Sequence, residues 1–269
     1  MTTYLLLSLA GLVGGFIAGL TGIGTGFLMV VVIPIALNYL GIPGEEIVRF
    51  TIANTVFATM CSAFVNNISM WRTRQLHIKE TALVSLVAVI FAGVILQFFV
   101  LKESYPTNIY NTVLIIFLSY IIYRTINKLR HAIHYEEDRS RIKLTLTGMS
   151  AGMVSALTGL GGGSIIIPML NLWLKMDIKK AKSISFGAIF SISLMLTIIN
   201  LLNTPVANIH YAHWGYILIP VALPLSIGVI IASPLGTGLS DKLSSKTITI
   251  IFLIVISAVL LRKIFELWG

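Results

Sequence analysis

Charged residues are scarce in this chain of 269 residues. Asp, Glu, Lys and Arg together make up 11% of it, whereas 57% of the residues are hydrophobic and the mean hydropathy is +0.94. A soluble domain carries about 25% charged residues because its surface must be solvated. The shortage therefore excludes a soluble domain and predicts that most of the surface faces hydrocarbon.

Cysteine and acidic residues are also nearly absent. Cys61 is the only cysteine, which excludes an intramolecular disulfide and a cysteine-based zinc site. The ten Asp and Glu residues all fall in predicted loops or at the ends of apolar segments. No HExxH pattern, paired carboxylates or Ser/His/Asp arrangement occurs within an apolar segment, so an intramembrane enzyme is not indicated, and we expect neither a cofactor nor a metal.

What the chain does contain is a series of ten apolar segments. Six of them have about 20 residues or more, enough to cross a hydrocarbon core of about 30 Å. The segments cover residues 4–20, 27–40, 47–69, 80–101, 107–126, 143–158, 164–174, 183–203, 213–235 and 247–266. The first, second, sixth and seventh are shorter, and these lie in matching places in the two halves of the chain.

The match between the halves is an internal repeat centred on two glycine-rich turns. The first turn, Leu20-Thr21-Gly22-Ile23-Gly24-Thr25-Gly26, matches Leu157-Thr158-Gly159-Leu160-Gly161-Gly162-Gly163 at an offset of 137 residues, with five of seven positions identical. Further along, Pro34, Thr51 and Asn66 match Pro168, Ser185 and Asn200 at an offset of 134. A chance match of glycine-rich segments would not stay in register over such a distance, so we interpret it as a duplication.

Each half holds five segments, and an odd number makes the second copy enter the membrane upside down. We therefore predict an all-α polytopic membrane protein of two inverted-topology repeats, with glycine-rich broken or re-entrant helices near the midplane. The first repeat would cover residues 1–127, a cytoplasmic linker 128–142, and the second, inverted repeat 143–269. Inverted repeats are typical of secondary transporters, whose substrate site lies between the two copies.

The basic residues orient this topology. With the N-terminus outside, 15 of the 19 Lys and Arg residues fall in predicted cytoplasmic loops and four outside, as the positive-inside rule requires. Both termini are thus predicted to be outside. The net charge of +9 is in this interpretation a topology signal and does not indicate a nucleic-acid partner.

The predicted linker is the only long polar stretch. It contains His131 and His134 near Glu136, Glu137 and Asp138. Their spacing fits no specific metal site, so we interpret the stretch as a connection between the repeats.

The glycine-rich turns are the candidate binding site. Glycine permits close backbone approach, and a helix that begins after such a turn presents unpaired N–H groups to an anion. The alternative is that the glycines only let helices pack closely, which we prefer for Gly11, Gly15 and Gly19. The predicted substrate-binding residues are Thr21, Gly22, Gly24, Thr25, Gly26, Asn54, Thr158, Gly159, Gly161, Gly162, Gly163, Ser164 and Ser185. Arg49 and Lys182 flank equivalent segments and are either vestibule residues that attract an anion or ordinary interface anchors.

The pair of turns, followed by Ile165-Ile166-Ile167-Pro168 and accompanied by Trp214 at the start of the penultimate segment, resembles the TauE/SafE family of membrane permeases. The resemblance covers essentially the whole chain. It implies a carrier in the prokaryotic plasma (inner) membrane that moves a small anion such as sulfite, sulfoacetate or another organosulfonate or carboxylate, most simply an exporter that works by alternating access. One departure is that Val31 stands where Pro168 would be in strict register. An anion channel and a non-transporting membrane accessory protein are the alternatives, and the sequence leaves open whether the protein forms a homodimer.

Overall fold

The computed structural model describes residues 2–101, 105–130, 138, 140–240 and 242–268. Within them the chain forms ten α-helices, one π-helical turn and one two-stranded sheet. The helices are α1 (Thr2–Thr21), α2 (Gly26–Tyr39), α3 (Gly44–Arg72), α4 (Ile78–Ile95), α5 (Thr107–Arg130), α6 (Arg141–Thr158), α7 (Gly163–Leu172), α8 (Ile178–Leu202), α9 (Ile219–Ser240) and α10 (Ser245–Trp268). The π-helix η1 (Leu96–Val100) continues α4, and strands β1 (His213–Trp214) and β2 (Ile217–Leu218) precede α9.

These elements confirm the predicted all-α membrane architecture. Each of the ten predicted apolar segments overlaps one α-helix, and the segment 80–101 also covers η1. In the described part of the chain, seven helices are long and apolar enough to cross a membrane. Helices α2 and α7, which directly follow the two glycine-rich turns, have only 14 and 10 residues.

The predicted segment 213–235 was wrong at its beginning. His213 pairs with Leu218 and Trp214 with Ile217 in an antiparallel hairpin, and α9 begins only at Ile219. Gly215 in the turn of this hairpin has φ of +55°, a left-handed conformation that an α-helix cannot contain. Hydropathy does not distinguish a short apolar hairpin from the first turn of an apolar helix.

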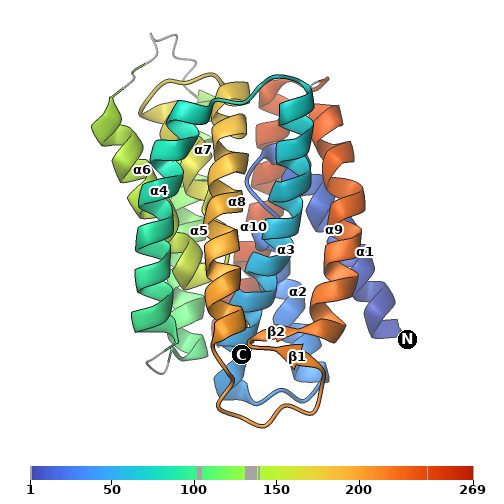
Figure 1. The fold of residues 1–269 in the computed structure, drawn as a ribbon. Helices are drawn as coiled ribbons and strands as arrows, with labels where there is room; N and C mark the ends of the chain where they lie inside the picture. Colours follow the sequence, from blue (N-terminus) through green and yellow to red (C-terminus); the bar gives the residue numbers. More distant parts are fainter. Residues whose placement is uncertain (1, 102–104, 131–137, 139, 241, 269) are drawn as a thin grey trace.

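The bundle has two distinct ends (Figure 1). One end, which we call the hairpin end, carries the β1–β2 hairpin, the beginning of α1, the α2–α3 connection and the end of α10. The other, which we call the linker end, carries the α3–α4, α7–α8 and α9–α10 connections together with the end of α5 and the beginning of α6. The connections between the helices are thus divided between the two ends of the bundle.

Both short helix pairs return to the end at which they enter. Helix α1 begins and α2 ends at the hairpin end, and α6 begins and α7 ends at the linker end (Figure 1). At the linker end, Lys143 in the first turn of α6 donates from Nζ to the Trp173 carbonyl oxygen directly after α7, at 3.3 Å. Each glycine-rich turn therefore forms the tip of a helical hairpin inside the bundle.

Helices from the two halves pack in exchanged pairs. Helix α1 runs along α9, where a Cβ on Gly11 would lie 2.3 Å from the Leu225 carbonyl oxygen and one on Gly15 2.7 Å from the Val229 Cα. Helix α6 runs along α4 in the same way, and a Cβ on Gly152 would lie 2.2 Å from the Ala88 carbonyl oxygen. Glycine is required in these positions because the two backbones touch, as in other small-residue interfaces.

Candidate functional site

The two glycine-rich turns meet face to face between α3 and α8. A Cβ on Gly26 would lie 2.6 Å from the Leu160 Cα, and a Cβ on Gly163 would lie 2.4 Å from the Ile23 carbonyl oxygen. These contacts are reciprocal, because Gly26 corresponds to Gly163 and Ile23 to Leu160 at the offset of 137. The structure therefore brings the two predicted turns together and shows that some of their glycines allow this close contact.

Other glycines in the turns are required by backbone conformation. Gly22 and Gly24 have φ of +78° and +103°, and Gly159, Gly161 and Gly162 have values between +76° and +78°. Side chains rarely adopt this region, whereas glycine does so at little cost. Gly159 is the left-handed C-cap of α6, and Gly162 is the left-handed N-cap residue of α7. The helices are thus broken at the turns by glycine conformation.

Thr59, in the middle of α3, links both turns. Its hydroxyl lies 2.9 Å from that of Thr25 in the first turn. A Cβ on Gly161 in the second turn would lie 2.6 Å from its Cγ2. Thr59 is fully buried. The sequence did not predict Thr59 as a site residue, because nothing in the sequence distinguishes it from the other hydroxyl-bearing residues of α3.

Helices α2 and α7 begin in the bundle interior without side-chain caps. Thr25, the N-cap residue of α2, accepts no hydrogen bond from the first turn with its side chain, and Gly162, the N-cap residue of α7, has no side chain that could do so. Ser164, next to the beginning of α7, is fully buried, and its Oγ has no hydrogen-bond partner among the described residues. First-turn N–H groups and such a hydroxyl are donors that an anion could accept from.

The side-chain hydroxyl groups of three predicted site residues donate hydrogen bonds to backbone carbonyl oxygens. Thr21 donates to Ile17 at 2.8 Å, Thr158 to Val154 at 2.6 Å, and Ser185 to Gly22 at 3.0 Å. The last bond ties α8 directly to the first turn. These side chains therefore shape the turns in this conformation.

Asn54 is placed differently from the other predicted site residues. Its Nδ2 donates to the carbonyl oxygens of Phe50 and Tyr216, and its Oδ1 accepts from the backbone N–H of Leu218 at 3.0 Å. The amide therefore holds the β1–β2 hairpin against α3. With both amide atoms engaged, Asn54 fixes the entry into α9 in this conformation.

A hollow of about 510 Å³ opens at the hairpin end between α2, α3, α5 and α10. Thr51 and Asn111 line it, and both side chains are buried. Thr51 Oγ1 and Asn111 Oδ1 have no hydrogen-bond partner among the described residues. Tyr110 lines the same hollow and donates from its hydroxyl to the Thr158 carbonyl oxygen at 3.3 Å, so the hollow reaches the second turn.

The hairpin-end hollow also contains a cluster of charges that the sequence analysis missed. Lys263 is 1% exposed, with Nζ 2.6 Å from Glu266 and 5.8 Å from the centre of the Tyr110 ring. Arg262 pairs with the same carboxylate at 3.2 Å. Two cations share one carboxylate, so the cluster carries a net positive charge that favours an anion.

A much smaller hollow lies on the linker side of the first turn. It consists of two parts of about 50 and 30 Å³ that share Thr21, Ile178 and Ile248. Pro168 lines this linker-end hollow, and Pro34, its counterpart in the repeat, lines the hairpin-end hollow. The two hollows therefore occupy corresponding positions in the two halves, but only one is wide.

Lys182 lies in the linker-end hollow and is 7% exposed. A Cβ on Gly22 would lie 2.6 Å from its Cγ, so its side chain packs directly on the first turn. Its Nζ donates to Ser240 at the end of α9 and lies 5.6 Å from the centre of the Phe186 ring. Of the two predicted vestibule residues, Lys182 is the one that reaches a glycine-rich turn.

Arg49 occupies a more peripheral place near the beginning of α3. It lies 3.4 Å from Glu46, whose carboxylate also accepts from the backbone N–H of Val206 at 2.9 Å. This cluster joins α3 to the α8–α9 connection. The side chain of Arg49 therefore contributes to the hairpin end of the bundle.

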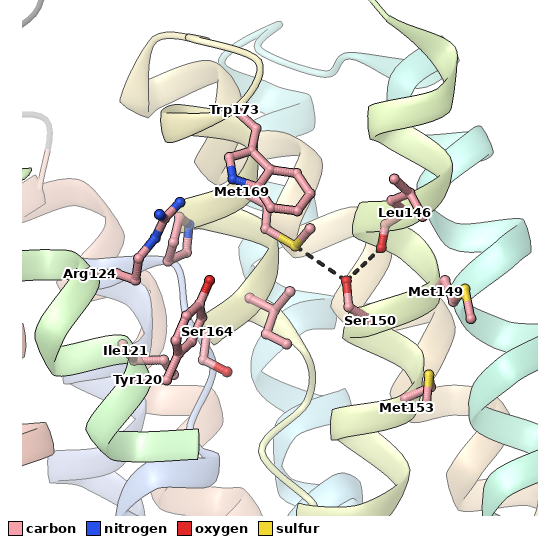
Figure 2. Close-up of a pocket in the computed structure, with 12 residues that line it drawn as sticks. Tyr120, Ile121, Arg124, Leu146, Met149, Ser150, Met153, Ser164, Met169 and Trp173 are labelled. Atoms are coloured by element: carbon pink, nitrogen blue, oxygen red, sulfur yellow. Dashed lines mark hydrogen bonds between the residues drawn. The ribbon is translucent and has the colours of Figure 1, made fainter. Parts of the chain in front are cut away.

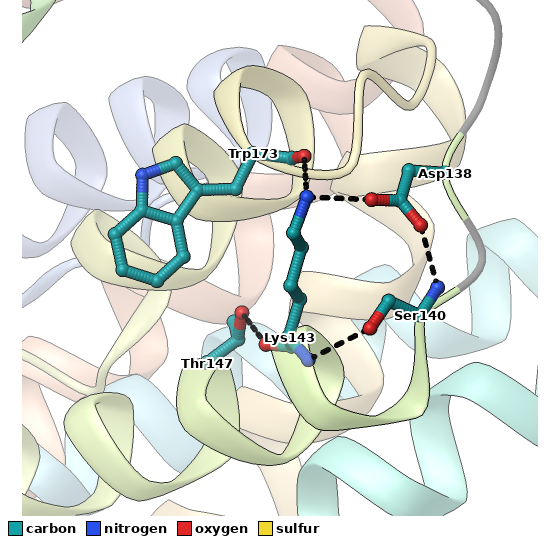
Figure 3. Close-up of polar contacts among 5 residues, drawn as sticks. All are labelled: Asp138, Ser140, Lys143, Thr147 and Trp173. Carbon is teal, nitrogen blue, oxygen red and sulfur yellow. Dashed lines mark hydrogen bonds and ion pairs between the residues drawn. The ribbon is translucent and has the colours of Figure 1, made fainter.

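The histidines and glutamates of the predicted linker, residues 131–137, lie outside the described residues. Among the residues that the structure describes, no group of three or more His, Cys, Asp and Glu residues is placed to hold a metal. Asp138 is described and lies 2.6 Å from Lys143 (Figure 3). The Lys143 ammonium and the Ser140 N–H hold the pKa of the Asp138 carboxyl below its usual value.

Seven apolar helices and two broken hairpins that meet at mid-bundle define a multi-pass membrane protein of the transporter class. Comparison with known proteins gives the family: residues 7–262 match the model of the sulfite exporter TauE/SafE family, and the chain belongs to this family. A probable membrane transporter protein of Methanocaldococcus jannaschii is 28% identical over 91% of this chain and 89% of its own length. Another, of Haemophilus influenzae, is 28% identical over 96% of this chain and 98% of its own length. The resemblance noted in the sequence is thereby confirmed, and the protein is a membrane transporter and not an enzyme.

Proposed function

We propose that this protein is a secondary transporter that exports a small anion, such as sulfite, sulfoacetate or another organosulfonate or carboxylate, by alternating access. The observation that carries the proposal is the pair of corresponding hollows on opposite sides of the two turns. One has about 510 Å³, and the other is divided into parts of about 50 and 30 Å³. Two corresponding cavities of unequal width are what a carrier open to one side would show.

The exchanged helix pairs and the reciprocal turn contacts support two inverted repeats, residues 1–127 and 143–269, joined by a linker at 128–142. In an inverted repeat, the conformation in which the cavity of the first half is open has a counterpart in which the cavity of the second half is open. The unequal hollows would then exchange widths during transport. With 15 of 19 basic residues assigned to loops at the linker end, that end would be cytoplasmic, and both termini would lie outside the prokaryotic inner membrane.

The binding groups would be donors and cations on both sides of the turns. On the hairpin side these are the Thr51 hydroxyl, the side-chain NH2 group of Asn111 and the Lys263 ammonium group, and on the linker side Lys182 next to Gly22. All are buried, so an anion bound there would lose water and gain charge-assisted hydrogen bonds. The packed glycines between the hollows would keep the site closed to at least one side, which favours a carrier over an anion channel.

Cysteine accessibility tests this arrangement. In a Cys61→Ser background, Ile47→Cys, at a partly exposed position that lines the hairpin-end hollow, should react with an impermeant thiol reagent applied at the hairpin end at least tenfold faster than Thr21→Cys reacts from the linker end. The reason is the difference in hollow width on the two sides. A transported anion should slow the first reaction and accelerate the second, because it allows the cycle to populate the other conformation.

Thr73→Cys serves as the control, since Thr73 is exposed at the linker end and should react fully from that side. Equal and simultaneous reactivity of Ile47→Cys and Thr21→Cys would indicate a channel and contradict alternating access. Faster reaction of Thr21→Cys would contradict the assignment of the open side.

A further inference from the structure

A third cavity lies on the outer surface of the bundle and adjoins the linker-end hollow at Pro168, which lines both. This groove of about 330 Å³ runs between α5, α6 and α7. Figure 2 shows Arg124 and Trp173 towards one end and Ser164 and Met153 further along. Most of the lining is apolar, and three methionines contribute to it, Met149, Met153 and Met169.

The groove faces the surroundings of the protein. Tyr120, Leu146 and Trp173 line it and are 51%, 45% and 37% exposed. In a membrane protein, exposed apolar side chains at this depth face lipid. The groove is therefore open sideways to the bilayer.

Its length matches one leaflet. Trp173 lies directly after α7 at the linker end, and Ser164 lies near the beginning of that helix. Nine residues of helix rise about 14 Å, close to half of a hydrocarbon core of about 30 Å. An acyl chain that enters beside Trp173 would thus end near Ser164, against the second glycine-rich turn.

The mouth of the groove carries a positive charge. The Arg124 guanidinium lies 5.9 Å from the centre of the Tyr120 ring, and no carboxylate of the described residues forms an ion pair with it. The neighbouring Lys143, by contrast, is held by Asp138 and the Trp173 carbonyl oxygen (Figure 3). Arginine is suited to a phosphate because its guanidinium offers several donors in a planar arrangement.

We propose that this groove binds a phospholipid with an anionic headgroup. The phosphodiester would lie at Arg124, between the rings of Tyr120 and Trp173, which are residue types typical of the interface between bilayer and water. One acyl chain would follow the methionines towards Ser164. The flexible methionine side chains adapt to such an irregular apolar ligand. Basic pockets between membrane helices are suited to lipid headgroups.

Trp173 provides a direct optical probe of the groove. In a variant with Trp71→Phe, Trp214→Phe and Trp268→Phe, Trp173 is the remaining tryptophan. When this variant is reconstituted in phosphatidylcholine, brominated phosphatidylglycerol should quench the Trp173 fluorescence at a mole fraction several-fold lower than the mole fraction of brominated phosphatidylcholine that gives the same quenching. Arg124→Gln should abolish this preference, and Arg124→Lys should retain part of it.

Arg141→Gln is the matched control, because Arg141 is exposed at the same end and does not line the groove. It should leave the preference unchanged. Equal quenching by both lipids, or a preference that survives Arg124→Gln, would overturn the proposal. Relief of quenching by millimolar inorganic phosphate would also overturn it, because it would assign the groove to a soluble anion.

Discussion

Replacing Gly163 with alanine is expected to abolish most transport and to lower stability. The new Cβ would lie 2.4 Å from the Ile23 carbonyl oxygen, which belongs to backbone and cannot move without shifting the first turn. Overpacking of a close-packed interior typically costs about 1–3 kcal/mol. We expect a clear fall in the thermal unfolding temperature of the purified protein and at least a tenfold fall in anion flux into proteoliposomes.

Gly26→Ala should have a similar effect, because its Cβ would meet the Leu160 Cα in the corresponding contact. Gly238→Ala is the matched control: Gly238 lies in α9, and a Cβ there would have no atom within 4 Å. Alanine is favoured over glycine in a helix by about 1 kcal/mol, so this variant should be at least as stable as the parent. Normal flux and stability in Gly163→Ala would show that contact between the turns is not required.

Replacing Lys182 with glutamine is expected to reduce the transport kcat/KM at least tenfold, which corresponds to about 1.4 kcal/mol. Its side chain packs on Gly22, and its ammonium group is the buried positive charge of the linker-end hollow. Removing the charge should weaken anion binding when the cycle exposes this side. The measurement is initial flux against anion concentration, with a raised KM as the expected signature.

Two further variants separate the charge of Lys182 from its structural role. Ser240→Ala removes the hydroxyl that accepts from Nζ but keeps the charge, and should retain most transport. Lys246→Gln removes an exposed charge at the same end and should have little effect. If Lys182→Gln transports normally, or if Ser240→Ala is equally impaired, Lys182 does not act through its charge.

The sequence predicted the helices and the two turns well because both depend on strong local signals. Long apolar segments require helices in a membrane, and the duplicated glycines mark the positions at which α1 and α6 end. The contact between the turns was not predictable in detail, because the reciprocal approach of Gly26 to Leu160 depends on how two distant halves dock.

Individual polar side chains were predicted less well. Asn66, which the sequence marks only as the counterpart of Asn200, is fully buried and joins Ser233 and Thr237 of α9 in a hydrogen-bond network. Lys263 is one of the four basic residues predicted to lie outside, and the structure places it buried beside Tyr110. In an apolar helix the sequence shows that a residue is polar, but the face on which it lies and its partner are set by packing between helices.

Counterflow in proteoliposomes tests the central claim most directly. A thermal-shift screen of small anions would first identify one that stabilises the purified protein, since a ligand that binds the folded state raises its apparent stability. Uptake of that labelled anion should then saturate with concentration and accelerate when the unlabelled anion is loaded on the opposite side. Uptake that does not saturate and ignores the opposite side, or no uptake above protein-free liposomes for any anion of the panel, would contradict transport of a small anion by alternating access.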